Sequence, residues 1–145
     1  MIVTDTTLHW ETAQKIAMAA CKYASDKNLR ICAWVLDKHG NPLSMQRINN
    51  APMPSTKIAQ GKAHTAVSFG FGTHLWQEKL AEKQYLLDGL NAQDDVVMFG
   101  GGLPIKHKDE IIGAIGISGA SEAQDQQCAE AGIAAFIALN SSIAN

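Results

Sequence analysis

The sequence is poor in cysteine, with three in 145 residues and none in a Cys-x-x-Cys pair. Cys21, Cys32 and Cys128 lie far apart along the chain, which argues against a disulfide framework and against a cysteine-based zinc site. Free cysteines usually pack as small buried hydrophobes. We therefore expect a reduced, cytoplasmic protein.

Long apolar runs and an excess of positive charge are also missing. The formal net charge is −2, which is not the broad cationic surface that nucleic-acid binding needs. No apolar run is long enough to cross a bilayer. The first residues, Met1–Asp5, lack the basic and apolar segments of a signal peptide. We expect one globular domain over residues 1–145 that binds neither nucleic acid nor membranes.

Histidines with metal-ligand spacing are absent as well. No pair of the five histidines has the i, i+4 spacing with a carboxylate that marks zinc hydrolases, so no metal site is predicted. A single histidine needs no sequence partner to ligate a haem iron, so only the fold can test that role. The order of the residues also selects no Ser-His-Asp or Cys-His set.

The apolar periodicity predicts an α+β fold. The order α-β-β-α-α-β-β-β-α, dominated by hairpins, indicates an antiparallel five-stranded sheet with helices packed on it. The predicted helices cover residues 8–27, 55 or 56 to 69, 73 to about 85, and 121 to about 139, and the predicted strands cover 31–36, 43–47, 96–99, 103–107 and 111–118.

Glycine is concentrated near the C-terminal end, since half of the twelve glycines lie between Gly100 and Gly119. Glycine costs backbone entropy, so this density indicates turns with positive φ or the close approach of another group. The segment Phe99–Pro104 predicts either an exposed nest of backbone N–H groups or a sharp corner between strands.

The strand predicted over residues 111–118 has two unlike faces. One face is bulky with isoleucine, whereas the other carries Ala114, Gly116 and Ser118, with only Ile112 large there. Glycine in a strand often marks close backbone approach. The bare face therefore indicates either a helix or neighbouring subunit lying close, or the floor of a ligand pocket.

Three charged residues stand out by position. Lys62 lies on the small, apolar side of its predicted helix, where a lysine extends to solvent, forms a structural ion pair or belongs to a site. Arg47 ends a strand and is either an ordinary surface arginine or a clamp for a carboxylate. Asp125 falls in the first turn of the last helix, where its charge suits the helix dipole.

Taken together, these motifs resemble the GlcG/HbpS-type family, which also occurs as the C-terminal domain of PduO-type corrinoid adenosyltransferases. The resemblance implies a compact α-β-α domain, homo-oligomers, and haem or corrinoid-related binding in some members. It also implies an accessory role in glycolate, glycerol or propanediol metabolism. The matching residues are Val35–Asp37 with Gly40, Arg47, Ser55, Lys62-Ala63 with Thr65-Ala66, Gly101–Ile105, Gly113–Gly119, and Asp125 with Ala129.

The leading hypothesis is a cytoplasmic, homo-oligomeric small-molecule-binding protein, with Arg47 and Lys62 meeting carboxylates and with His64 or His9 ligating haem iron. One alternative is an enzyme acting on an oxygenated C2–C3 metabolite, with Lys62 as the charged group and Asp125 in support. Another is a structural assembly module. The predicted ligand-binding residues are Arg47, Lys62, Gly101, Gly102, Pro104, Gly116 and Ser118.

Overall fold

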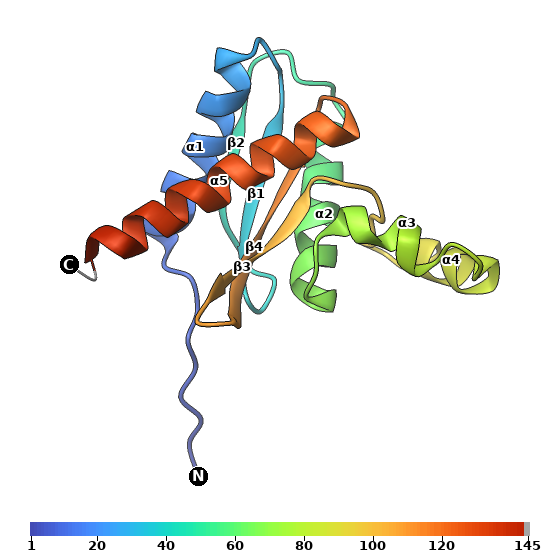
Figure 1. The fold of residues 1–145 in the computed structure, drawn as a ribbon, viewed down its shortest axis with the longest axis horizontal. Coiled ribbons are helices and arrows are strands. Elements are labelled where there is room, and N and C mark those ends of the chain that lie inside the picture. The colour runs from blue at the N-terminus through green and yellow to red at the C-terminus, as the bar shows by residue number, and fades with distance from the viewer. Residues whose placement is uncertain (144–145) are drawn as a thin grey trace.

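A four-stranded antiparallel sheet lies between two helical layers in the computed structural model, which describes residues 1–143 (Figure 1). Helices α1 (Trp10–Asp26) and α5 (Glu122–Ile143) cover one face, and α2 (Ser55–Phe69) covers the other. The strand order is β2-β1-β4-β3. The strands are β1 (Cys32–Asp37), β2 (Pro42–Arg47), β3 (Gly102–His107) and β4 (Glu110–Ser118).

The predicted α+β class is correct, but the five-stranded sheet and the predicted order are wrong. The observed order is α-β-β-α-α-α-β-β-α, apart from one 3₁₀ turn, and residues 96–99 form no strand. The Val97 amide donates to the Thr65 hydroxyl on α2 (2.9 Å) instead of joining the sheet. A Cβ atom on Gly61 would lie 2.6 Å from Cγ2 of Val97, so this β-branched segment packs against a helix.

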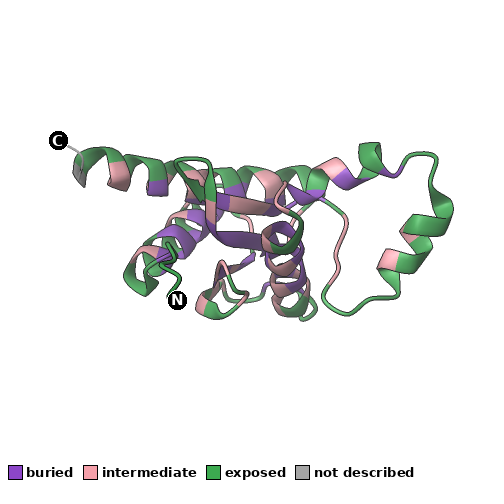
Figure 2. Cartoon of the chain, turned by 90° about the horizontal axis from the view of Figure 1, so that it is seen from below, coloured by how far each residue is buried: buried purple, intermediate pink, exposed green. Residues whose placement is uncertain are grey.

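The main hydrophobic core lies between the sheet and the layer formed by α1 and α5. Figure 2 shows buried ribbon in the strands at the centre of the molecule. On β4, Ile115 packs toward Gly132 of α5, which also lies close to Ile16 of α1. Glycine at position 132 allows α5 to lie this close to β4, because a Cβ atom there would be 2.9 Å from Cδ1 of Ile115. Ile115 of β4 therefore faces this core, as its side-chain alternation predicts.

At the start of β4 the predicted faces are exchanged, because the pairing with β3 is irregular between Ile105 and Lys106. Ile112 belongs to the core cluster, whereas Ile111 lies near Gly70 at the end of α2.

The bare face of β4 is covered by the chain's own helix α2. A Cβ atom on Gly116 would lie 2.0 Å from the carbonyl oxygen of Ala59 and 2.5 Å from the amide nitrogen of Ala63. Only glycine permits that approach of helix to strand. Gly116 therefore underlies α2 instead of lining a ligand cavity.

Between α2 and β3 the chain leaves the three-layer body and forms an arm, residues 73–99 (Figure 1). The arm contains a 3₁₀ turn (Thr73–Leu75), α3 (Trp76–Lys79) and α4 (Gln84–Asn91), so the single helix expected from 73 to 85 is interrupted. The helix α4 continues to Asn91, beyond the predicted helix end near residue 85. Thr73 does not cap a helix, because its hydroxyl accepts a hydrogen bond from the Gly102 amide (2.9 Å).

The ends of the long helices depend on local capping. His9 is the N-cap of α1, and its Nδ1 accepts from the Glu11 amide (3.3 Å), so the helix begins two residues after the predicted start at residue 8. The Ser121 hydroxyl accepts from the Gln124 amide (3.2 Å) at the start of α5, as its position predicts. None of the helices among residues 1–143 combines the length and the apolarity needed to cross a membrane.

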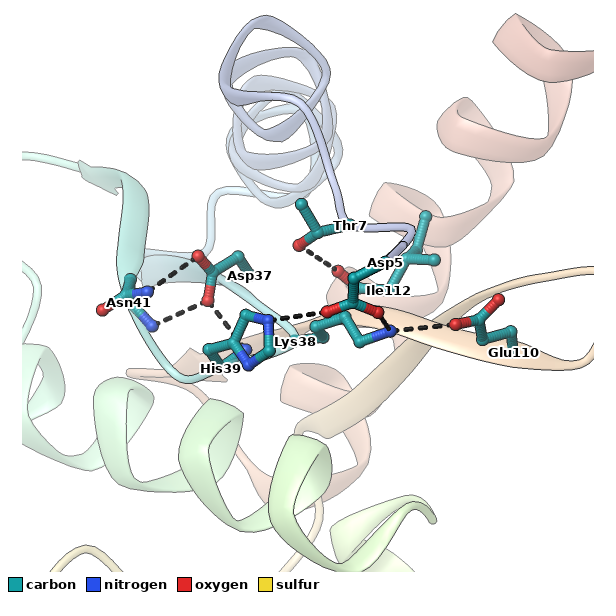
Figure 3. A network of polar contacts seen from close by, with 8 residues as sticks. All are labelled: Asp5, Thr7, Asp37, Lys38, His39, Asn41, Glu110 and Ile112. Carbon is teal, nitrogen blue, oxygen red and sulfur yellow. Dashed lines mark hydrogen bonds and ion pairs between the residues drawn. The ribbon is translucent and has the colours of Figure 1, made fainter. Parts of the chain in front are cut away.

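A polar network ties the N-terminal segment to two turns of the sheet (Figure 3). Lys38, in the β1–β2 turn, pairs with Asp5 and with Glu110 of β4, the latter at 2.9 Å. Asp37 closes the same turn, because its carboxylate accepts from the amides of His39 and Asn41, both at 2.9 Å. This network lies at one end of the sheet and holds the segment that leads into α1 against it.

Candidate functional site

The largest fully buried side chain is that of Lys62, which is 1% exposed. Its Nζ donates to the carbonyl oxygen of Ile117 on β4 (2.8 Å) and to Oδ2 of Asp125 on α5 (2.9 Å). Asp125 is 2% exposed, and its other oxygen accepts from the Ala120 amide (3.0 Å). One ammonium group thus connects α2, β4 and α5, which belong to all three layers.

The electrostatics of this pair are set by burial. Burial lowers the pKa of Lys62 below its ordinary value, while the charge and hydrogen bond of Asp125 oppose that change. Burial likewise raises the pKa of Asp125, against the ammonium and the nearby backbone N–H groups. Each group needs the other, because an uncompensated charge in this interior is costly.

The glycine corner wraps around the ammonium group. Gly101 has φ +125°, and a Cβ atom there would lie 2.8 Å from Nζ of Lys62 and 2.6 Å from the Ile117 oxygen. The Phe99 ring lies 4.9 Å from Nζ, close enough for a cation–π contact. The chain therefore needs glycine at 101 both for the backbone conformation and to leave room for the lysine.

A cavity of about 310 Å³ opens beside the pair. Its lining includes Lys62 and Asp125, two serines, Ser55 and Ser118, and the rim residue Glu122. The Glu122 carboxylate accepts from the Gly100 amide (2.7 Å) and so fixes one side of the corner. The rest of the lining is Pro52, Pro54, Ile58, Phe99, Gly119 and Ala120.

A second cavity, of about 370 Å³, lies between the arm and the body, and Phe99 and Glu122 line both cavities. Its walls are largely apolar, including Trp76, Leu80 and Met98. The Phe99 side chain, 47% exposed, therefore lies between the cavity that contains the Lys62–Asp125 ion pair, called the polar cavity below, and the cavity of the arm.

Of the residues predicted to bind a ligand, Lys62 and Ser118 line the polar cavity, and Gly101 contacts Lys62 from behind. The others have structural surroundings. Gly102 lies against α2, since a Cβ there would be 2.4 Å from the Lys62 carbonyl oxygen. Pro104 lies in the edge strand β3, where its missing N–H costs no ladder hydrogen bond.

Arg47 holds a loop instead of facing the polar cavity. Its guanidinium donates to the carbonyl oxygens of Ala51 and Pro52, the latter at 3.3 Å, and to the Thr56 hydroxyl (3.0 Å). Because Pro52 lines the cavity, Arg47 shapes the cavity wall indirectly.

The two histidines predicted as haem ligands are not among the residues lining the cavity beside Lys62. His64 packs beside Gly40 in the β1–β2 turn. His9 lines a separate cavity of about 200 Å³, together with His107 of β3. The other lining residues there are Thr6, Thr7, Leu8, Thr12, Ile112, Phe136 and Asn140. The structure thus separates the lysine from the histidines that the sequence hypothesis placed in one site.

Sequence reasoning missed three of these features. Ser55 was noted only as a matching residue and as a possible helix start, and no pattern marks its hydroxyl as facing a cavity. Phe99 was assigned to a strand, although its place next to three glycines is consistent with a corner. His107 comes close to His9 only through the fold, since 98 residues separate them.

Comparison with known proteins places the chain among a defined set of relatives. The model of the family described as haem degrading protein HbpS-like matches residues 8–134. A 15.0 kDa protein of Citrobacter freundii, encoded between dhaT and dhaS, is 35% identical over 92% of this chain and 94% of its own length. Corrinoid adenosyltransferase PduO of Salmonella typhimurium is 31% identical over 92% of this chain, which spans only 40% of that protein.

Three solved structures share the fold and about a third of the sequence. Protein ORFY of Klebsiella pneumoniae is 33% identical, with a TM-score of 0.86 over 94% of this chain and 95% of that one. A double mutant of Streptomyces reticuli HbpS is 33% identical, with a TM-score of 0.84 over 92% and 89%. The PduOC:heme complex is 30% identical, with a TM-score of 0.82 over 90% and 95%. These comparisons confirm the resemblance that the motifs indicate.

The Lys62–Asp125 contact is testable by a double-mutant cycle. Lys62→Met and Asp125→Asn should each lower the free energy of unfolding by about 3–5 kcal/mol, because each leaves an uncompensated buried charge. The double variant should lose clearly less than the sum, with a coupling of about 1–3 kcal/mol in urea unfolding curves.

Lys57→Met is the matched control, because Lys57 lies on the same helix and is exposed. It should leave the free energy of unfolding within about 0.5 kcal/mol of the parent chain. Additive losses for the Lys62 and Asp125 variants would contradict the ion pair.

Proposed function

Because this chain belongs to the HbpS-like family, we propose that it is a homo-oligomeric accessory protein that binds haem or a corrinoid-related tetrapyrrole. The accessory role would lie in glycolate, glycerol or propanediol metabolism, as the resemblance implies, and the similarity to corrinoid adenosyltransferase PduO supports a corrinoid-related context. The observation that carries the binding proposal is the cavity that brings His9 and His107 together. The PduO domain solved with heme, similar over 90% of this chain, adds support.

The donor set of the histidine cavity fits one edge of a haem group. Imidazole is a common axial ligand of haem iron. Phe136 and Ile112 supply apolar contacts for a porphyrin face, and Thr6 and Asn140 supply hydrogen-bonding groups for polar substituents. When bound, haem would supply a redox-active iron centre, and this chain's residues would position it.

The size and hydrogen bonding of this cavity limit how haem is held. A volume of about 200 Å³ accommodates an edge of the macrocycle, so part of the group would remain outside this chain. Nδ1 of His9 already accepts from the Glu11 amide (3.3 Å), which leaves Nε2 for iron. Ligation through Nε2 places the ring proton on Nδ1 and so removes that helix-capping bond. His107, in a strand, caps no helix, and its Nδ1 lies 3.5 Å from Nδ2 of Asn140.

Haem titration followed by the Soret band tests the proposal. The parent chain should give a shifted, saturable Soret band. His9→Asn keeps a residue type that caps helices but removes the imidazole, and His107→Ala removes the second one. At least one of these variants should change the band or weaken binding about tenfold or more.

His64→Ala is the matched control, since His64 lies beside the β1–β2 turn and not in the cavity. It should bind haem as the parent chain does. No Soret shift with the parent chain, or the same band in all three variants, would refute histidine ligation.

Homo-oligomerisation through the arm is the second part of the proposal. No residue of α4 is buried, although the helix carries Tyr85, Leu86, Leu87 and Leu90. Tyr85 is 78% exposed. Next to this helix lies the apolar cavity of about 370 Å³, so one arm presents both apolar side chains and an apolar groove. A second copy would satisfy both, because a two-fold interface uses one surface twice.

Sedimentation equilibrium tests this interface. The parent chain should be a dimer or a larger assembly, and the double variant Tyr85→Ser/Leu86→Ser should shift it toward monomer. Met18→Ser changes an apolar side chain of similar exposure, 51%, on α1 and should leave the assembly unchanged. A monomeric parent chain, or an assembly indifferent to both variants, would contradict an arm-mediated interface.

The two alternative functions, an enzyme and a structural assembly module, are not equally well supported. An enzyme acting on an oxygenated C2–C3 metabolite requires Lys62 and Asp125 to share a cavity. Both line the cavity of about 310 Å³, and Nζ of Lys62 lies 2.9 Å from Oδ2 of Asp125. A structural assembly module was argued from the bare glycine face, but α2 of the same chain fills that face at Gly116. The enzyme is therefore the better supported alternative.

A further inference from the structure

Two serines line the cavity beside Lys62, and neither hydroxyl makes a side-chain hydrogen bond within residues 1–143. Ser55 is 1% exposed and Ser118 is 6% exposed, and both line the cavity of about 310 Å³. Hydroxyls that face a cavity bind water or a ligand oxygen. A ligand oxygen in the cavity would satisfy them.

The backbone around these hydroxyls is consistent with a polar ligand. Ser55 begins α2, whose N-cap, Pro54, makes no side-chain capping hydrogen bond. Ser118 ends β4, directly after Ile117, whose carbonyl oxygen accepts from Lys62. The two serines thus approach one space from adjacent layers, α2 and the sheet, with the ammonium group between their elements.

The charge of the cavity selects against anions. Three ionisable side chains line it: Lys62, Asp125 and Glu122. Lys62 is neutralised by Asp125 at 2.9 Å, and Glu122 adds a carboxylate at the rim. The lining therefore carries one net negative charge, which disfavours a carboxylate or phosphate ligand.

The walls define the rest of the ligand. Pro52, Pro54 and Ile58 form apolar surface on the α2 side, and Phe99 lies over the ammonium group at the corner. Apolar walls with a few placed polar groups are typical of small-molecule sites. A short carbon skeleton would contact the walls while its oxygens reach the serines.

We propose that this cavity binds a small neutral molecule carrying two or more hydroxyl or carbonyl oxygens, held by the Ser55 and Ser118 hydroxyls. Lys62 and Asp125 keep the floor polar, and the negative rim at Glu122 repels acidic analogues. The site is independent of the proposed haem-binding histidines, which line another cavity.

An NMR titration of the ¹⁵N-labelled chain with three probes tests this site. Glycerol and dihydroxyacetone are neutral, and glycerate has the same carbon number with one negative charge. The neutral probes should shift the amide signals of residues 118–120 and of Phe99. Glycerate should bind about tenfold more weakly or not at all.

Serine variants identify the contacts. Ser55→Ala and Ser118→Ala should each weaken the better neutral probe about tenfold, the effect of one lost hydrogen bond to a buried group. Ser68→Ala, at an exposed position of α2, should leave its affinity unchanged. Amide spectra of each variant establish that the fold is retained.

Three results would overturn the proposal: tighter binding of glycerate than of both neutral probes, no shift at residues 118–120, or unchanged affinity in both serine variants. The last two results would mean that the hydroxyls contact water alone. None of them alters the Soret titration, so failure here is distinguishable from failure of haem binding.

Discussion

The burial of one ammonium group constrains the rest of this structure. The Lys62 side chain extends from α2 past the C-terminal end of β4, where it donates to the Ile117 carbonyl oxygen, and contacts Asp125 on α5. It therefore connects the two helical layers at one end of the sheet. Because an unpaired charge would be costly there, the helices can pack only where the carboxylate meets the ammonium. The pair therefore fixes how α2 and α5 sit relative to β4, and it places a polar floor under a cavity.

The glycine-rich segment follows from the same constraint. Gly101 leaves room for the ammonium, and Gly116 lets α2 approach the sheet closely enough for Lys62 to reach the Ile117 carbonyl. The glycines that suggested a binding loop thus act mainly by bringing backbone segments together. The serines that we propose to contact a ligand line the cavity beside Lys62, whereas the histidines suited to haem line another cavity. One small domain therefore carries two separate candidate sites.

Much of this fold could be predicted from the sequence, because the main helices and the two hairpins carry strong periodicity and turn residues. The segment 96–99 could not, since an apolar β-branched run looks the same whether it pairs with a strand or, like Val97, packs on a helix. The sequence joins Lys62 and Asp125 only as members of a hypothetical active site, and the fold gives their direct contact at 2.9 Å. Arg47 shows the reverse: a residue type suited to binding carboxylates holds a loop.

The titration of Lys62 itself tests this account most directly. In the chain labelled with ¹³C at lysine Cε, NMR spectra recorded as the pH is raised report each lysine, and Lys62→Met assigns its signal. Burial should make Lys62 lose its proton at a lower pH than the exposed lysines, with Asp125→Asn lowering that pH further. Titration of Lys62 together with the exposed lysines, unaffected by Asp125→Asn, would contradict the buried pair.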